Sequence, residues 1–158
     1  MILGVGVDIV AIARVKDAID TAGGVFLHAV YAPWELSRAA DHPDPFAYYS
    51  MLFAAKEAVS KAFGTRWDVE VSLSDIEIRD GDNGEPVAAV HGHFEQLATE
   101  RGGAVVLVSL SHDGPPQWRR FTITALALIF RFQYWPPFLE EDENETNGAL
   151  CQEVLRLS

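Results

Sequence analysis

The chain has 158 residues, of which 49% are hydrophobic and 22% are charged. These values are typical of one globular domain that buries a core of its own. The 12 Lys and Arg residues face 23 Asp and Glu residues, and the resulting net charge of −11 disfavours nucleic acids and anionic membranes as partners.

Cysteine usage and hydropathy point to a reducing compartment. Cys151 is the only cysteine, so neither an internal disulfide nor a cysteine-rich zinc site is expected. The N-terminus lacks the basic start and long apolar region of a signal peptide. The longest apolar stretch, residues 121–130, is about half of the roughly 20 residues that a membrane-spanning helix needs. We therefore expect a cytoplasmic protein with no membrane partner.

Hydrophobic periodicity and the positions of Gly and Pro predict strands and helices interspersed around one sheet. In the first half we expect a buried strand over residues 1–12 that ends near Asp8, a helix over 11–22, two short helices within 25–38, and a central helix over 46–63. In the second half we expect a strand over 69–78, a hairpin turn at 81–84, a return strand over 86–91, a helix over 94–101, and strands over 104–110 and 121–130 around a loop at 111–120. The layout predicts an α+β fold with helices packed on the sheet.

Residues 131–158 differ in composition from the rest of the chain. They contain two adjacent prolines and then four consecutive acidic residues. We expect a single domain at 1–130 followed by an acidic, partly disordered C-terminal extension at 131–158.

The first candidate site residue is Asp8, in the segment GVGVDIV at residues 4–10. A carboxylate at the end of a buried strand, beside glycines that let a ligand approach the backbone, suits a metal or phosphate site. An aspartate after a strand is equally a common N-cap for the following helix. The segment alone leaves both interpretations open.

The second candidate is the pair Glu57 and Lys61, in the segment FAAKEAVSKAFGT at residues 53–65. Residues four apart lie on one face of a helix, so the plain interpretation is a solvated ion pair. The alanines around Glu57 and the apolar flanks indicate instead that much of this helix is buried. A buried carboxylate needs a cation, and either magnesium or Lys61 would supply one.

The third candidate group is Ser111, His112 and Asp113, which follow a hydrophobic strand. A Ser/His hydrolase is disfavoured, because no Gly-x-Ser-x-Gly segment is present and sequence neighbours rarely have nucleophile-to-base geometry. A ligand-binding loop and a turn held by Asx bonding both remain open.

Taken together and in this order, the three segments resemble the holo-acyl-carrier-protein synthase family of small 4′-phosphopantetheinyl transferases. The resemblance extends to Arg14, to the segment DIEI at residues 75–78 and to GEP at residues 84–86. It covers about residues 1–130, and five co-linear motifs make a chance match implausible.

The resemblance implies the single-domain 4′-phosphopantetheinyl transferase-like fold and its chemistry. The 4′-phosphopantetheine arm of coenzyme A would pass to a serine of an apo carrier protein, with Mg²⁺ as cofactor and adenosine 3′,5′-bisphosphate as the other product. Such phosphoryl transfer depends on positioning and charge neutralisation. The resemblance also implies a homotrimer with sites between subunits, working in the cytoplasm for fatty acid or polyketide biosynthesis.

The same resemblance assigns roles to residues of this chain. Asp8 and Glu57 would hold the metal, and Glu57 and Lys61 would be catalytic. Arg14 would contact the carrier protein. The residues that would contact coenzyme A are Lys61, Gly64, Thr65, Ser111 and His112.

The chain departs from the family pattern in its tail from residue 131, in a longer loop at 114–120, and at three further places. Leu52 stands where the family has an arginine that helps to hold coenzyme A phosphate, and Leu73 stands where it commonly has tryptophan. The carrier-docking helix, usually rich in basic residues, keeps Arg14 and Lys16, but residues 21–30 contain no Lys or Arg. We expect an active transferase; the alternative is a relative that binds coenzyme A or a carrier without transfer.

Overall fold

A computed structural model describes residues 1–65, 71–112 and 122–130. In this part of the chain, five antiparallel strands form one sheet in the order β1-β5-β4-β3-β2. The strands are β1 (Ile2–Ala11), β2 (Ile76–Asp80), β3 (Pro86–Val90), β4 (Val105–His112) and β5 (Thr122–Phe130). Among the described strands, the N-terminal strand is therefore an edge strand, and β5 is the one strand hydrogen-bonded to it.

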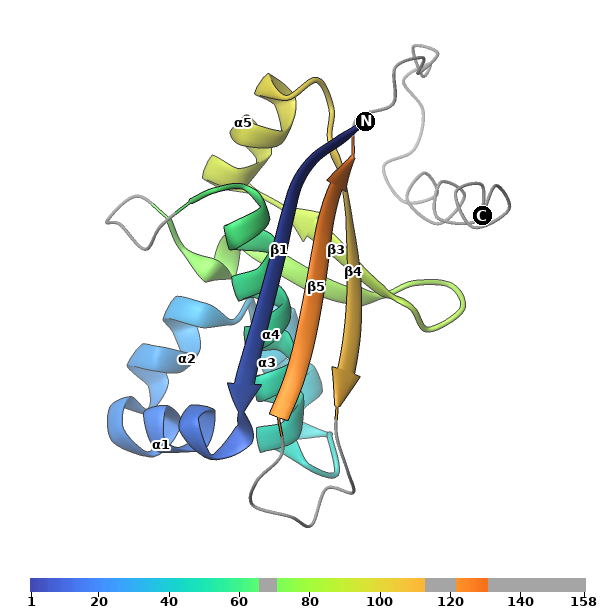
Figure 1. The fold of residues 1–158 in the computed structure, drawn as a ribbon. Coiled ribbons are helices and arrows are strands. Elements are labelled where there is room, and N and C mark those ends of the chain that lie inside the picture. Colours follow the sequence, from blue (N-terminus) through green and yellow to red (C-terminus); the bar gives the residue numbers. More distant parts are fainter. Residues whose placement is uncertain (66–70, 113–121, 131–158) are drawn as a thin grey trace.

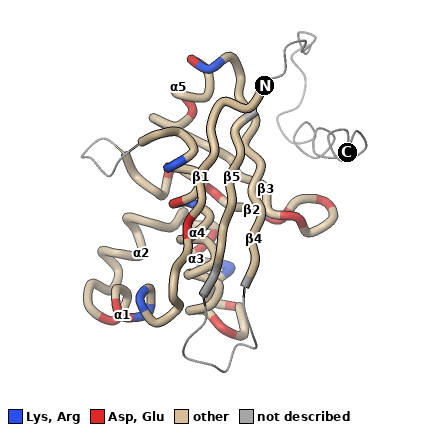
Figure 2. Tube along the Cα trace, in the orientation of Figure 1, with Lys and Arg blue, Asp and Glu red and all other residues tan. Residues whose placement is uncertain are grey.

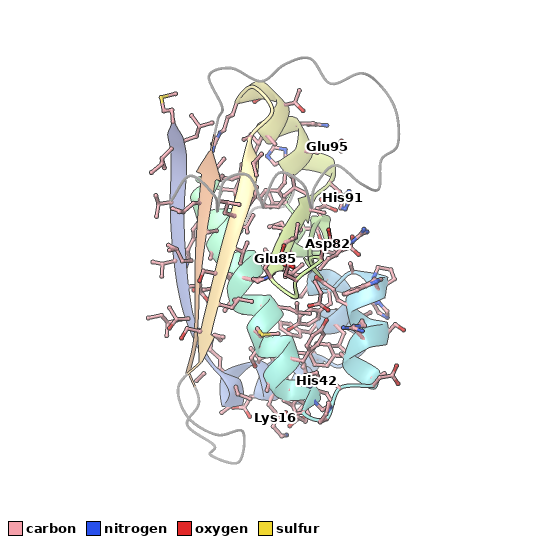
Figure 3. The ribbon with its side chains drawn as sticks, turned by 90° about the vertical axis from the view of Figure 1, so that its right-hand side faces the viewer. Lys16, His42, Asp82, Glu85, His91 and Glu95 are labelled. Atoms are coloured by element: carbon pink, nitrogen blue, oxygen red, sulfur yellow. The ribbon has the colours of Figure 1, made fainter. Side chains whose placement is uncertain are left out.

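The helices gather on one side of the strands β1, β5 and β4, as the edge-on view in Figure 3 shows. They are α1 (Ile12–Ala22), α2 (Gly24–Val30), α3 (Pro33–Ala40), α4 (Pro45–Ala62) and α5 (Gly92–Glu100), with a short 3₁₀ helix at Leu73–Asp75. The longest, α4, lies directly against β1 and β5 (Figure 1). The core of the domain is built around it.

The sequence of α4 explains both its length and its close fit to the sheet. Asp44 caps its start by accepting a hydrogen bond from the backbone N–H of Ala47 at 3.0 Å, and Pro45 occupies the first turn. Its buried face is rich in alanine. A Cβ added to Gly6 of β1 would lie 1.9 Å from the carbonyl oxygen of Ala58, so only glycine permits this approach.

The expected α+β, single-domain architecture is confirmed, with three corrections to the strands. The first strand, expected to end near Asp8, continues to Ala11. The strand expected over residues 69–78 is shorter: Ser72 caps the 3₁₀ helix through a bond from the N–H of Ser74, and the strand begins only at Ile76. The strand expected to be buried at 1–12 is buried on one face only. Its outer face exposes Ile2, Val5, Val7 and Ile9, because no element of the described chain covers it.

Two further expectations concern membranes and the C-terminal extension. No described helix has the length and apolar character to cross a membrane. The extension expected at 131–158 lies outside the described residues.

Candidate active site

Asp8 lies on the face of β1 that is turned toward α4. Side chains alternate along a strand, and here Gly6 and Val10 are buried while Val7 and Ile9 are exposed. Asp8 shares the inner face, and its side chain is 15% exposed. The carboxylate therefore lies between β1 and α4. It is not the N-cap of α1, which is Ala11 and makes no side-chain cap bond.

The position of Asp8 along α4 follows from the glycines before it. A Cβ on Gly4 would meet the carbonyl of Ala62, and a Cβ on Gly6 would meet that of Ala58. Two residues of strand span about 6.6 Å and four residues of helix about 6 Å, so each step along β1 matches one turn of α4. Two residues beyond Gly6 on β1, Asp8 is therefore expected beside the turn of α4 that precedes Ala58 and contains Glu57.

Lys61 contacts Asp8 from the neighbouring helix α4. Its ammonium donates to Asp8 Oδ1 at 2.6 Å and to the backbone oxygen of Val7 at 3.2 Å. Helical side chains point back toward the N-terminus, which is why a residue opposite Gly4 to Gly6 reaches Asp8. Glu57 is only 9% exposed and lies one turn before Lys61. The fold thus pairs Lys61 with Asp8 and places Glu57 one turn earlier on the same helix.

The donor set at this place suits a hard divalent cation that also binds a substrate. Asp8 and Glu57 offer carboxylate oxygens at low exposure. In the described part of the chain no group of three or more His, Cys, Asp or Glu side chains could hold a metal ion. Mg²⁺ usually takes one or two protein carboxylates and completes its shell with water and phosphate oxygens. The residues therefore fit Mg²⁺ and do not form a closed structural metal site.

Gly64 and Thr65 end α4 one turn after Lys61. Gly64 has φ 69°, and its N–H donates to Lys61 O at 2.9 Å while the N–H of Thr65 donates to Ser60 O at 3.2 Å. This pair of bonds is a Schellman motif, which favours glycine at the left-handed position. Among the described residues, none lies within 4 Å of a Cβ added to Gly64.

Ser111 and His112 are placed differently from the expectation of a loop. Both belong to β4, where Ser111 pairs with Thr124 and His112 with Ile123 of β5. The loop prediction was wrong because the β4–β5 ladder continues two residues beyond Leu110. Asp113 lies outside the described residues.

The register also assigns Ser111 to a face of the sheet. Thr124 pairs with Ser111 on one side and with Ile9 on the other. Directly opposed residues of antiparallel strands share a face, and Ile9 is 62% exposed on the outer face. Ser111 therefore lies on the outer face, whereas Asp8 lies on the inner one. Within one chain the structure does not bring Ser111 to Asp8, Glu57 and Lys61.

Arg14 lies on α1 at a largely apolar pocket of about 230 Å³, lined also by Val10, Val15, Ala18, Phe26 and Phe53. Val10 is two residues beyond Asp8 on the inner face of β1, and Phe53 is one turn before Glu57. The pocket thus lies two residues along β1 from Asp8 and one turn along α4 from Glu57.

Arg14 is also the cation that the described chain leaves available. Among the described residues no hydrogen bond or ion pair engages it, whereas every other lysine and arginine there is engaged. Their partners are Asp20 for Lys16, Asp80 for Arg38, Glu35 for Lys56, Asp8 for Lys61, Glu77 for Arg79 and the backbone oxygen of Phe63 for Arg101.

The sequence interpretation missed the ion pair between Lys56 and Glu35. Their atoms Nζ and Oε2 are 2.6 Å apart and both side chains are fully buried. Lys56 also donates to the backbone oxygens of Val30 and Leu73, and Glu35 accepts from the N–H groups of Ala32 and Ile78. Burial lowers the pKa of Lys56, and Glu35 opposes that shift.

This network is structural, because its donors and acceptors are used inside the protein. The signal that could have revealed it is Glu35 at the third position of a helix that begins with Pro33, where a glutamate reaches back to the helix start. Leu52 is likewise part of the core, at 2% exposure, so the arginine position of the family pattern serves packing here.

Comparisons with known proteins show the family to which the chain belongs. Residues 4–123 match the model of the 4′-phosphopantetheinyl transferase superfamily. The holo-[acyl-carrier-protein] synthase of Desulforudis audaxviator is 40% identical over 72% of this chain and 86% of its own length; that of Jannaschia is 35% identical over 81% and 87%. The crystal structure of the Neisseria meningitidis enzyme of the same name superposes with a TM-score of 0.72 at 30% identity, over 83% of this chain and 100% of that one. The chain therefore belongs to the 4′-phosphopantetheinyl transferase superfamily, within its holo-[acyl-carrier-protein] synthase family.

Proposed function

We propose that this chain transfers the 4′-phosphopantetheine arm of coenzyme A to a serine of an apo acyl carrier protein, with Mg²⁺ as cofactor. The observation that carries the proposal is the convergence of Asp8, Glu57 and Lys61 between β1 and α4. A similar structure supports the co-substrate: the holo-(acyl-carrier-protein) synthase of Bacillus anthracis, 28% identical with a TM-score of 0.59, was solved in complex with coenzyme A. The reaction belongs in the cytoplasm, in fatty acid or polyketide biosynthesis.

In this mechanism the carrier serine Oγ bonds to the phosphorus that bears the pantetheine arm. The bond from that phosphorus to the bridging oxygen breaks, and adenosine 3′,5′-bisphosphate leaves with the electron pair. Glu57, directly or through a water, accepts the serine proton. Lys61 neutralises charge on the leaving phosphate.

Asp8 and Glu57 would hold the metal, which when bound supplies positive charge to the pyrophosphate oxygens. Two carboxylates at low exposure are costly without such a cation.

For coenzyme A we propose contacts with Lys61, Gly64, Thr65, Ser111 and His112. Support comes from the position of Gly64 one turn beyond Lys61, where no described residue would contact an added Cβ. Ser111 lies on the outer face of the sheet, so it would contact coenzyme A held by the Lys61 of another copy.

A homotrimer with sites between subunits fits the outer face of the sheet. Ile2, Val5, Val7 and Ile9 of β1 and Leu126 of β5 are exposed there, at 39–62%. The strands β4 and β5 carry no Lys, Arg, Asp or Glu, and Figure 2 shows them without charge marks. An uncharged face of this kind on a long edge strand is typical of a surface that a partner chain covers.

For the carrier protein we propose docking at α1, through Arg14 and the adjoining apolar pocket. The pocket is one step from Asp8 and Glu57, so an apolar side chain seated there would hold the carrier beside the transfer site. Lys16 contributes little charge because Asp20 neutralises it.

One assay tests the proposal: the purified full chain with Mg²⁺, coenzyme A and a panel of apo acyl carrier proteins, scored by the mass gained by each carrier. Transfer to at least one carrier is expected, and Glu57→Gln should abolish it without loss of the fold. Coenzyme A binding with no transfer to any carrier would favour the non-catalytic alternative, to which the buried Leu52 gives support. Normal turnover by Glu57→Gln would overturn the metal and base assignments.

A further inference from the structure

Lys61 occupies one of the two carboxylates that would hold the metal. Its Nζ is 2.6 Å from Asp8 Oδ1 and 3.2 Å from the backbone oxygen of Val7. An oxygen that ligates Mg²⁺ lies about 2.0–2.1 Å from the ion. A divalent cation on Asp8 would therefore stand within a few ångströms of the ammonium, and like charges so close repel each other.

The ammonium of Lys61 is able to leave Asp8, unlike that of Lys56 on the same helix. Lys56 is fully buried and its ammonium is held by Glu35 and two backbone oxygens. The side chain of Lys61 is 47% exposed, and only Asp8 and Val7 hold it among the described residues. Its flexible four-carbon stem can swing the ammonium toward solvent without opening the core.

We propose that Lys61 is a placeholder cation: it neutralises Asp8 in the unliganded enzyme and transfers to a phosphate of coenzyme A when the metal arrives. This inference rests on the proposed function, because it needs a phosphate group at the site. A phosphate that takes up the ammonium removes the obstacle to the metal on Asp8. The metal and coenzyme A consequently bind with positive coupling, and the coupling is reciprocal.

The ion pair with Lys61 also compensates the charge of Asp8 in the absence of ligand. Asp8 is a carboxylate at 15% exposure between β1 and α4, and an uncompensated charge there is costly. With Lys61 in place, Asp8 is neutralised before coenzyme A binds. The cost is a weaker affinity for free metal, since the ion must displace a tethered competitor.

The test measures binding rather than turnover, on the full chain. Mn²⁺ affinity is measured by electron paramagnetic resonance, with and without coenzyme A, for the wild type, Lys61→Gln and Lys61→Arg. Without coenzyme A, Lys61→Gln should bind Mn²⁺ about tenfold more tightly than the wild type, which corresponds to about 1.4 kcal/mol. Lys61→Arg keeps the cation and should resemble the wild type. Circular dichroism and thermal unfolding check that each variant is folded.

A second pair of variants separates the ion pair from simple charge. Asp8→Asn and Glu57→Gln each remove one negative charge, but only Asp8→Asn releases Lys61. Coenzyme A binding in the presence of a chelator, measured by calorimetry, should strengthen at least threefold more in Asp8→Asn than in Glu57→Gln. Equal effects in the two variants would contradict a placeholder role.

The results also distinguish this inference from the proposed function. If coenzyme A binds no variant, with or without metal, the proposed function fails, whereas the Mn²⁺ comparison without coenzyme A still decides the placeholder role. If coenzyme A binds but Lys61→Gln leaves Mn²⁺ affinity within twofold of wild type, the placeholder role alone is overturned. Absence of Mn²⁺ binding by both proteins without coenzyme A would overturn it as well.

Discussion

Replacing Lys56 by methionine removes the cation from the buried ion pair that joins α4 to α3. The partner Glu35 is fully buried and would keep only the N–H groups of Ala32 and Ile78, each at 2.8 Å. Removing one member of a buried pair costs about 3–5 kcal/mol. We expect the lower end, about 3 kcal/mol, since two hydrogen bonds still stabilise the carboxylate. This is a large part of the stability of a domain this size.

The reverse change, Glu35→Gln, predicts a dependence on pH. Burial already lowers the pKa of Lys56 from 10.5, and Glu35 is the leading influence that raises it. Without Glu35 the pKa falls further, so at alkaline pH the folded variant binds fewer protons than the unfolded chain. The free energy of unfolding of the variant then rises with pH between the lowered pKa of Lys56 in the folded state and the ordinary lysine pKa. Below the lowered pKa this gain in stability is absent. The deficit relative to wild type should therefore be smaller at about pH 9 than at about pH 7.

Urea unfolding followed by circular dichroism measures these differences. Lys16→Met is the matched surface control: it breaks the exposed pair with Asp20, whose members are 47% and 53% exposed, and should cost at most about 0.5 kcal/mol. The double variant Lys56→Met/Glu35→Gln should be more stable than the sum of the two single changes predicts, because it leaves no uncompensated charge. A loss below about 1 kcal/mol for Lys56→Met, or simple additivity, would refute the reasoning.

Further predictions concern packing, assembly, docking and the C-terminal extension. Gly6→Ala should cost about 3 kcal/mol or more in urea unfolding, whereas Gly24→Ala, whose Cβ would meet only His28 at 3.9 Å, should be tolerated; equal losses would contradict the close approach. Val5→Lys should yield a folded monomer by light scattering, and an unchanged oligomer would show that another surface assembles the chain. Ala18→Leu fills the pocket and should raise the KM for the carrier at least threefold, with the exposed Ala13→Leu as control; an unchanged KM would argue against docking there. Deletion of residues 136–158 should leave unfolding and turnover unaltered, and loss of solubility would count against an independent extension.

Helices and turns whose ends are marked by Pro or Gly were predicted well from the sequence. Pro45 and Gly64 mark the two ends of α4, and the predicted helix over 46–63 differs from the observed one by a single residue at each end. The turn at 81–84 joins β2 to β3 as expected. The shared face of Glu57 and Lys61 followed from helical spacing alone. These features depend on neighbours in the chain, which a single sequence contains.

Tertiary contacts decided what the sequence left open. Lys56 and Glu57 are adjacent, and nothing local says that Lys56 is paired with a residue of α3 in the core. The outcome depends on α3, which presents Glu35 to Lys56 from 21 positions earlier in the chain. In the same way Asp8 could be a cap or a ligand until the approach of β1 to α4 placed it beside Lys61.

The face of the sheet on which each residue lies was the hardest feature to predict, and it has the largest consequence for the site. A shift of one residue in register moves a side chain to the other face, and no local signal fixes the register between β1, β5 and β4. The structure pairs Ser111 with Thr124 and Thr124 with Ile9, so Ser111 lies on the outer face of the sheet, whereas Asp8 lies on the inner face. One coenzyme A molecule that contacts both Lys61 and Ser111 must then take them from two copies of the chain. Dissociating the proposed homotrimer should consequently weaken coenzyme A binding even in variants whose Asp8, Glu57 and Lys61 are intact.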